Sequence, residues 1–68
     1  MRYFEVAFHT GSGIFSCNII KGTTGEACRA AAEAHAKKYR YEISYFMEID
    51  PETLKYNRKP IWDAERYA

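Results

Sequence analysis

The feature that most restricts the fold is an alanine-rich segment in the middle of the chain. Residues 24–40, TGEACRAAAEAHAKKYR, contain no proline and consist largely of strong helix formers, which predicts a helix. At about 100° per residue, its charged side carries Arg29, Glu33, Lys37 and Arg40, and its opposite side carries Cys28, Ala31, Ala32, His35 and Tyr39. Small side chains on the buried side allow close approach to a sheet, so the sheet must supply the bulky core residues.

Residues 2–9 and 14–21 alternate between apolar and polar side chains, as half-buried strands do. Residues 10–13, TGSG, predict a hairpin turn, because glycine adopts positive φ at little cost. The alternative is a phosphate loop, but such loops run from a strand into a helix, whereas this one runs into a strand. We expect the core face to carry Phe4, Val6, Phe8, Phe15, Cys17 and Ile19, and the outer face Tyr3, Glu5, Ala7, His9, Ile14, Ser16, Asn18 and Ile20.

The segment KGTTGEA, residues 21–27, opens the helix. Thr23 and Glu26 have the spacing of a capping box, in which each side chain satisfies a backbone donor at the helix start. The alternative is an anion site formed by Lys21 with the N–H groups of Thr24 and Gly25. That site lacks the G-x-x-x-x-G-K-[ST] pattern, and Glu26 would place a negative charge at the anion position. We therefore expect an ordinary helix N-cap.

After the helix, the chain is predicted to return to the sheet. Residues 41–50 alternate, with Ile43, Tyr45, Met47 and Ile49 on the core face and Glu42, Ser44, Phe46, Glu48 and Asp50 on the outer face. The sequence DPET predicts a turn, and residues 53–56 a short return strand. Residues 60–68 fit either a last strand or a short helical tail, with Ile61 or Trp62 covering one end of the core.

These elements predict a single α+β domain over residues 1–68 in the order β-β-α-β-β. One helix would pack on one face of a three- or four-stranded, mainly antiparallel sheet, giving two layers. Ten basic and nine acidic side chains leave a net charge of +1, which argues against a strongly basic nucleic-acid binder and against an acidic DNA mimic.

The composition also predicts where the protein resides. No apolar run approaches the roughly 20 residues needed to span a membrane. The start, MRYFEVAF, lacks the basic and then apolar pattern of a signal peptide. Two cysteines are too few for a disulfide scaffold. We therefore expect a cytoplasmic protein with reduced thiols and no membrane partner.

Cys28 and His35 share the buried side of the predicted helix, which raises the question of a nucleophile pair. Seven helical residues separate their backbones by about 10 Å, and no third group is evident to orient the imidazole. Adding Cys17 gives a Cys-Cys-His set, but its spacing matches no usual zinc pattern. We expect these side chains to pack in the core, with no catalytic residue, no metal and no cofactor.

The outer sheet face is part apolar and part acidic, and it predicts a partner unless the C-terminal tail folds across it. Because aromatic and arginine anchors dominate binding energy, our candidate partner-binding residues are Tyr3, Glu5, Glu42, Phe46, Glu48, Tyr56, Arg58 and Trp62. A separate basic and aromatic group predicts nucleic-acid contact as the alternative, through Lys37, Lys38, Arg40, Lys55 and Lys59. Cations are also favoured at helix C-termini by the helix dipole alone.

In element order, the chain resembles the small phage-encoded anti-CRISPR proteins. The resemblance lies in the hairpin around residues 10–13, the helix TTGEACRAAAEAHAKKY and the closing NRKPIWD. It spans most of the chain without a specific motif, so no functional residue is carried over. It implies an inhibitor that docks on a host complex without catalysis. We expect a non-enzymatic binding module, monomeric or dimeric, whose partner is another protein or a protein–nucleic-acid complex. The alternatives are a small nucleic-acid-binding protein and a self-associating structural protein.

Overall fold

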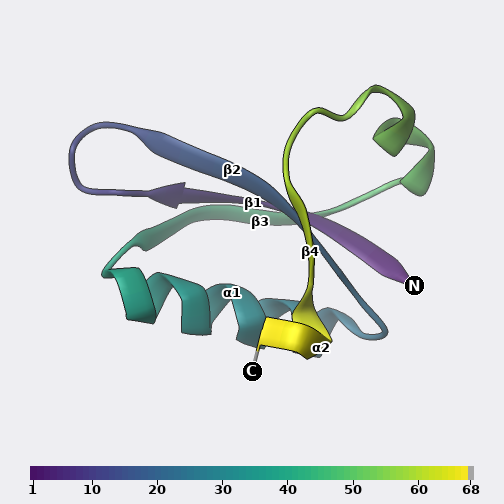
Figure 1. The fold of residues 1–68 in the computed structure, drawn as a ribbon, viewed down its shortest axis with the longest axis horizontal. Coiled ribbons are helices and arrows are strands. Elements are labelled where there is room, and N and C mark those ends of the chain that lie inside the picture. The colour runs from purple at the N-terminus through teal and green to yellow at the C-terminus, as the bar shows by residue number, and fades with distance from the viewer. Residues whose placement is uncertain (68) are drawn as a thin grey trace.

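A computed structural model of the chain describes residues 1–67, with the backbone alone at residue 67. A four-stranded sheet lies against one long helix, and a short helical segment projects from the far side of the sheet (Figure 1). The elements are β1 (Arg2–His9), β2 (Phe15–Gly22), α1 (Gly25–Tyr39), β3 (Glu42–Ile49), the 3₁₀ helix η1 (Pro51–Tyr56), β4 (Ile61–Asp63) and α2 (Ala64–Tyr67).

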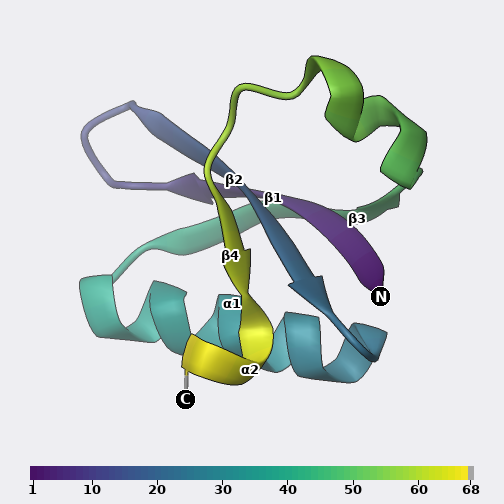
Figure 2. The ribbon, with the colours of Figure 1, turned by 45° about the vertical axis from the view of Figure 1, so that its right-hand side comes forward.

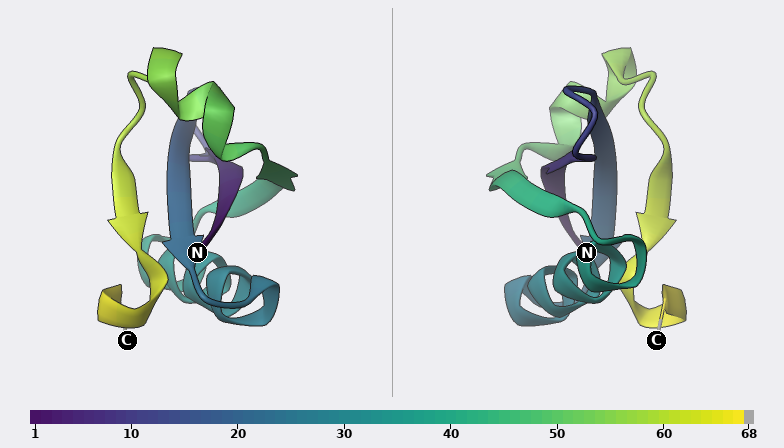
Figure 3. Two further views of the ribbon diagram at one scale, coloured as in Figure 1. Left: turned by 90° about the vertical axis from the view of Figure 1, so that its right-hand side faces the viewer. Right: turned by 90° about the vertical axis from the view of Figure 1, so that its left-hand side faces the viewer.

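The sheet has the strand order β3-β1-β2-β4. β1 pairs antiparallel with β2 and β3, whereas β4 pairs parallel with β2. Figure 3 shows the strands running from β4 at one edge to β3 at the other, with α1 beneath them. The α+β class is therefore confirmed, with a mixed sheet.

The first hairpin follows the expectation from its glycines. Thr10 donates its backbone N–H to the carbonyl of Ile14 at 3.1 Å, and its hydroxyl donates to the same oxygen at 2.9 Å. Gly11 and Gly13 adopt φ of 87° and 81°, in the region that favours glycine. The TGSG segment is thus a turn between two strands.

The N-cap of α1 lies one residue after the one expected from the sequence. Thr24 is the N-cap, and its hydroxyl accepts the N–H of Ala27 at 3.1 Å. Thr23 instead donates its hydroxyl to Glu65 in α2 at 2.9 Å. The prediction of a Thr23–Glu26 box is therefore wrong by one position. At the other end, Arg40 adopts the left-handed conformation with φ of 59° and ends the helix.

The predicted return strand at residues 53–56 is wrong, because that segment is part of η1. Asp50 caps this 3₁₀ helix, accepting the N–H of Glu52 on its carboxylate at 2.9 Å. Pro51 then occupies the first position, where its missing N–H costs no hydrogen bond. The Asp-Pro pair starts a helix here rather than a hairpin turn. The single-helix prediction is also corrected, because residues 60–68 include both the short strand β4 and the short helix α2.

The core lies between α1 and the sheet and contains Phe4, Val6, Phe8, Ile20, Cys28, Ala31, Ala32, Ala36 and Ala64. The expected pairing of bulky strand residues with a small-residue helix face is confirmed for β1 and α1. Alanines bring the helix close to the sheet, and the phenylalanines fill the space between them.

Two strands present the face opposite to the one predicted. In β2, Ile20 pairs with Phe4 and shares its core face, whereas Ile19 pairs with Glu5 on the other face. Phe15, Cys17 and Ile19 are therefore outward residues, and Ser16, Asn18 and Ile20 point toward the helix layer. The pairing register of the hairpin fixes this choice, and a one-residue difference moves every side chain to the other face.

In β3, a bulge breaks the alternation. Ala7 pairs with Tyr45 but Phe8 pairs with Ile43, so Ser44 is the extra residue. Phe46 pairs with Val6 on the helix side and stacks on Phe4 with ring centroids 4.8 Å apart. Tyr45, Met47 and Ile49 thus lie on the outer face, contrary to the prediction, whereas the core assignment of Ile43 is correct.

Candidate functional site

The face of the sheet away from α1 is called the open face below. Residues directly across the strands form four rows on it: Phe15–His9–Glu42, Cys17–Ala7–Tyr45, Ile19–Glu5–Met47 and Lys21–Tyr3–Ile49. The rows combine aromatic and aliphatic side chains with few charges. This composition sets the chemistry that the face can offer to a partner.

Residues 50–60 cover one end of the open face. η1 lies on the side of the sheet opposite α1 (Figure 2). A cavity of about 300 Å³ beneath it is lined by Ile19, Ile49 and Leu54, among others. Ile19 is only 2% exposed as a result. The tail therefore covers part of this face but does not cover all of it.

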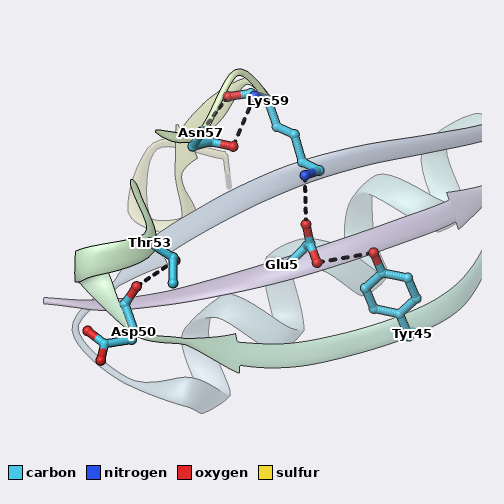
Figure 4. A network of polar contacts seen from close by, with 6 residues as sticks. All are labelled: Glu5, Tyr45, Asp50, Thr53, Asn57 and Lys59. Carbon is cyan, nitrogen blue, oxygen red and sulfur yellow. Dashed lines mark hydrogen bonds and ion pairs between the residues drawn. The ribbon is translucent and has the colours of Figure 1, made fainter. Parts of the chain in front are cut away.

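Glu5 ties this segment to the sheet. Its carboxylate accepts a hydrogen bond from the Tyr45 hydroxyl at 3.1 Å and lies 3.0 Å from Nζ of Lys59 (Figure 4). Burial, followed by the hydrogen bond and charge of Glu5, raises the pKa of Tyr45 to about 12. Tyr45 therefore remains a protonated donor at neutral pH. Asn57 holds the loop conformation by bonding the backbone N–H and carbonyl of Lys59.

The other end of the open face exposes a group of apolar side chains. Phe15 is 55% exposed, Tyr45 40% and Met47 52%, while Ala7 between them is buried. Cys17 is half-buried in the same row as Ala7 and Tyr45. We call Phe15, Cys17, Tyr45 and Met47 the open-face patch. The rings of His9 and Phe15 approach to 5.1 Å at its border.

The candidate partner residues do not all share this face. Tyr3, Glu5 and Glu42 lie on the open face, as predicted. The alternation of β1 predicted the first two, and that of residues 41–50 predicted Glu42. Phe46, Glu48 and Trp62 lie on the helix side of the sheet. The prediction that Phe46 and Glu48 lie on the outer face is therefore wrong. Both oxygens of Glu48 accept hydrogen bonds from Arg2, at 2.7 and 2.9 Å. This ion pair lowers the pKa of Glu48 and raises that of Arg2.

Tyr56 and Arg58 project from η1 and the loop after it. Tyr56 is 86% exposed, and Arg58 is also exposed. The sequence reasoning missed Phe15, Tyr45 and Met47, which it assigned to the core. The hairpin could have indicated that Phe15 lies on the outer face. A turn closed by Thr10 and Ile14 places Phe15 opposite His9, which the alternation of β1 assigns to that face.

The structure does not bring the two basic groups together. Lys37, Lys38 and Arg40 lie at the end of α1, whereas Lys55 and Lys59 lie in and after η1, at the far corner of the molecule (Figure 1). Lys55 pairs with Glu52 at 3.2 Å and Lys59 pairs with Glu5. These contacts leave the α1 group as the more available cationic surface.

The thiols and His35 sit in different surroundings. Cys28 is fully buried under the sheet, and burial raises the pKa of its thiol, whereas Cys17 belongs to the open face.

Within residues 1–67, no group of three or more His, Cys, Asp or Glu side chains is placed to hold a metal ion. Nor is any described helix long and apolar enough to cross a membrane.

His35 is the centre of an aromatic cluster on the helix side. Its ring lies 4.8 Å from the rings of Phe8 and Tyr39 and 5.4 Å from that of Trp62. Burial, and then the positive charge of Lys38, lowers the pKa of His35 below its ordinary value of 6.5. The imidazole is therefore neutral at neutral pH.

This shift predicts a pH dependence of stability. The unfolded chain takes up a proton at His35 near pH 6.5, whereas the folded chain takes it up only at lower pH. The contribution of neutral His35 to the unfolding free energy is therefore fully present above about pH 6.5 and is lost as the pH falls through that value. We expect His35→Phe to reduce the loss of unfolding free energy between about pH 7 and pH 5, measured by urea titration. Equal losses in the two proteins would contradict the assignment.

Beside this cluster, an open cleft of about 600 Å³ lies along the β4 edge of the sheet. It is lined by Asn18, Lys21, His35, Ile61, Trp62, Asp63 and Arg66. It is separate from the open-face patch, which centres on β1, β2 and β3. Trp62, a candidate partner residue, belongs to this cleft.

Comparison with known proteins finds no matching family model, no matching curated protein and no matching solved structure. The strand order and elements define a small α+β domain with a four-stranded mixed sheet.

Proposed function

We propose that this chain is a non-enzymatic binding module that docks on another protein through the open-face patch. The observation that carries the proposal is the exposure of Phe15 on β2 and of Tyr45 and Met47 on β3, on the two sides of the buried Ala7 of β1. Monomeric soluble proteins rarely leave contiguous apolar surface without a use. α1 and the core occupy the other face of the sheet, so the patch is not needed to complete the hydrophobic core.

The finer proposal concerns the kind of partner. The element order resembles that of the small phage-encoded anti-CRISPR proteins, which supports a cytoplasmic inhibitor that docks on a protein or a protein–nucleic-acid complex. Tyr45 offers an aromatic ring with a fixed hydroxyl, and Met47 offers an adaptable apolar contact. Glu42 and Tyr3, in the two end rows of the open face, and the exposed Tyr56 of η1 would supply a polar and aromatic rim, as in other interfaces.

Nucleic-acid binding is the second candidate. Lys37, Lys38 and Arg40 are exposed in one short stretch at the end of α1, with Tyr39 among them. Such a group can contact phosphates and stack a base. Titration of single- and double-stranded nucleic acid with the wild type and with Lys38→Ala separates this function from docking through the open face.

The proposal is tested by affinity capture with three baits: wild type, Met47→Lys and Ala34→Lys. Met47 is in the patch, whereas Ala34 is exposed on the outer side of α1, so both changes add one charge at an exposed position. A partner retained by the wild type and Ala34→Lys but lost by Met47→Lys supports docking through the patch. A partner retained equally by all three baits contradicts it. The mass of the pure protein in solution shows whether the partner is a second copy of the chain.

A further inference from the structure

The cleft beside β4 combines an aromatic wall with two cations. Trp62 and His35 line it from β4 and α1, and Lys21 and Arg66 line it from β2 and α2. Its volume of about 600 Å³ lies within the range of small-molecule sites, which is about 300–1,000 Å³. The cleft thus brings side chains from four elements to one concave surface.

The charges of the cleft are unequal. Among residues 1–67, the ion pairs join Arg2 to Glu48, Arg29 to Glu33, Lys55 to Glu52 and Lys59 to Glu5, and none of them uses Lys21 or Arg66. Asp63 is the one acid among the described residues that line the cleft, and its carboxylate accepts the backbone N–H of Glu65 at 2.9 Å. Among the described residues, two cations and one acid therefore line the cleft, and Asp63 is the cross-strand neighbour of Lys21.

Asn18 adds a neutral polar group. Its side-chain amide donates to the hydroxyl of Ser16 at 3.2 Å, and its oxygen accepts no hydrogen bond from the residues that the structure describes. Asn18 lies in the helix-side register of β2, opposite Val6. Lys21 has the other register and lines the cleft where β2 pairs with Asp63 of β4. An amide oxygen at this position can accept a hydrogen bond from a ligand N–H.

We propose that this cleft binds a small planar aromatic anion, of the size of a mononucleotide. Its ring would lie against Trp62, and its phosphate or carboxylate would be held by Lys21 and Arg66. Aromatic stacking and charge-assisted hydrogen bonds are the two interactions that such residues supply best. The Asn18 oxygen would then select ring systems that carry an N–H donor. This site is independent of docking through the open-face patch, because none of its residues belongs to that patch.

The test uses the fact that Trp62 is the only tryptophan in the chain, so fluorescence excited selectively at tryptophan reports on this cleft and not on the six tyrosines. The probes are adenosine monophosphate for the phosphate arm, orotate, whose ring also carries N–H donors, for the carboxylate arm and adenosine as the uncharged control. We expect a saturable change for at least one of the anions with a Kd of about 1 mM or tighter. Adenosine should bind at least about fivefold more weakly. The arm that binds identifies which anionic group the site prefers.

Three variants distinguish binding in the cleft from general charge attraction. Lys21→Ala and Arg66→Ala should each weaken anion binding by about fivefold or more. Lys38→Ala, which removes the same charge at the end of α1, should leave it unchanged. No saturation by either anion up to about 10 mM would overturn the proposal. So would equal binding of adenosine, or wild-type affinity in both cleft variants. Thermal unfolding curves confirm that each variant is folded and give a second readout, because a bound ligand raises the Tm.

Discussion

Replacing Phe8 with alanine is expected to leave the chain largely unfolded at room temperature, whereas the same change at Phe15 is expected to leave stability nearly unaltered. Phe8 is 0% exposed, and its ring packs on His35 at 4.8 Å and on Tyr41 at 6.2 Å. Truncating a buried phenylalanine costs about 3–5 kcal/mol, and a domain of this size has little stability beyond that. Phe15 is more than half exposed, so its truncation should change the unfolding free energy by about 0.5 kcal/mol or less.

The two variants form a matched pair, because the substitution is identical and only the face of the sheet differs. Circular dichroism and urea titration give the unfolding free energy of each protein. An equal loss of stability in both would contradict the register of β2, which places Phe15 on the open face. A folded and stable Phe8→Ala variant would contradict the position of the core.

Gly22→Ala is expected to destabilise the domain by about 1–3 kcal/mol, because the added methyl group has no room. A Cβ atom at Gly22 would lie 2.7 Å from Sγ of Cys28 and 3.3 Å from Cβ of Ala64. Gly22 ends β2 where the strand meets both helices, so the backbone there cannot move away without disturbing α1 or α2. The measurement is again urea titration, with Gly25→Ala as a comparison in which the nearest atoms are 3.3 Å away.

The clash with Cys28 can be tested by a double-mutant cycle. Cys28→Ala alone removes a buried sulfur and is expected to cost about 1 kcal/mol. In the double variant, the new methyl group occupies the space that the sulfur leaves, so the combined loss should be smaller than the two single losses together. A coupling of about 0.5 kcal/mol or more is expected. Strictly additive losses would show that the methyl group at Gly22 meets a different obstacle.

The outcome for Phe15 illustrates how far the sequence can predict this fold. β1 was correctly predicted because its core residues are all apolar at one parity, with Glu5 and His9 at the other. β2 carries apolar residues at both parities, with Phe15 and Ile19 on one and Ile20 on the other. Local pattern alone cannot choose between these faces. The pairing register made by the hairpin decides, and it depends on the neighbouring strand.

The error in β3 has a different cause. Its alternation is regular in the sequence, but the bulge at Ser44 shifts the pairing so that Ile43 and Phe46 share the helix side. A bulge is a property of the paired strands and leaves no pattern in one strand alone. The alternation therefore assigned the wrong residues of β2 and β3 to the open face. Among the candidate partner residues on β1 and β3, Tyr3, Glu5 and Glu42 were assigned to the open face correctly.

The cleft beside β4 could not be predicted at all from local pattern. It forms where the chain crosses back after η1 to pair Ile61 with Ile19 and Trp62 with Ile20. Residues as far apart in the sequence as Asn18 and Arg66 meet there through tertiary contacts alone. The short strand of three residues has too little alternation to identify it in the sequence.

Docking of a protein partner on the open-face patch is tested by measuring how patch and control variants change the affinity. The Kd of the purified partner is measured by calorimetry for the wild type, Met47→Lys and Ala34→Lys. The proposal predicts that Met47→Lys weakens binding by about tenfold or more, because a charge is placed in an apolar contact, while Ala34→Lys binds as the wild type does. Equal affinities of all three proteins, or a loss confined to Ala34→Lys, would contradict docking through this face.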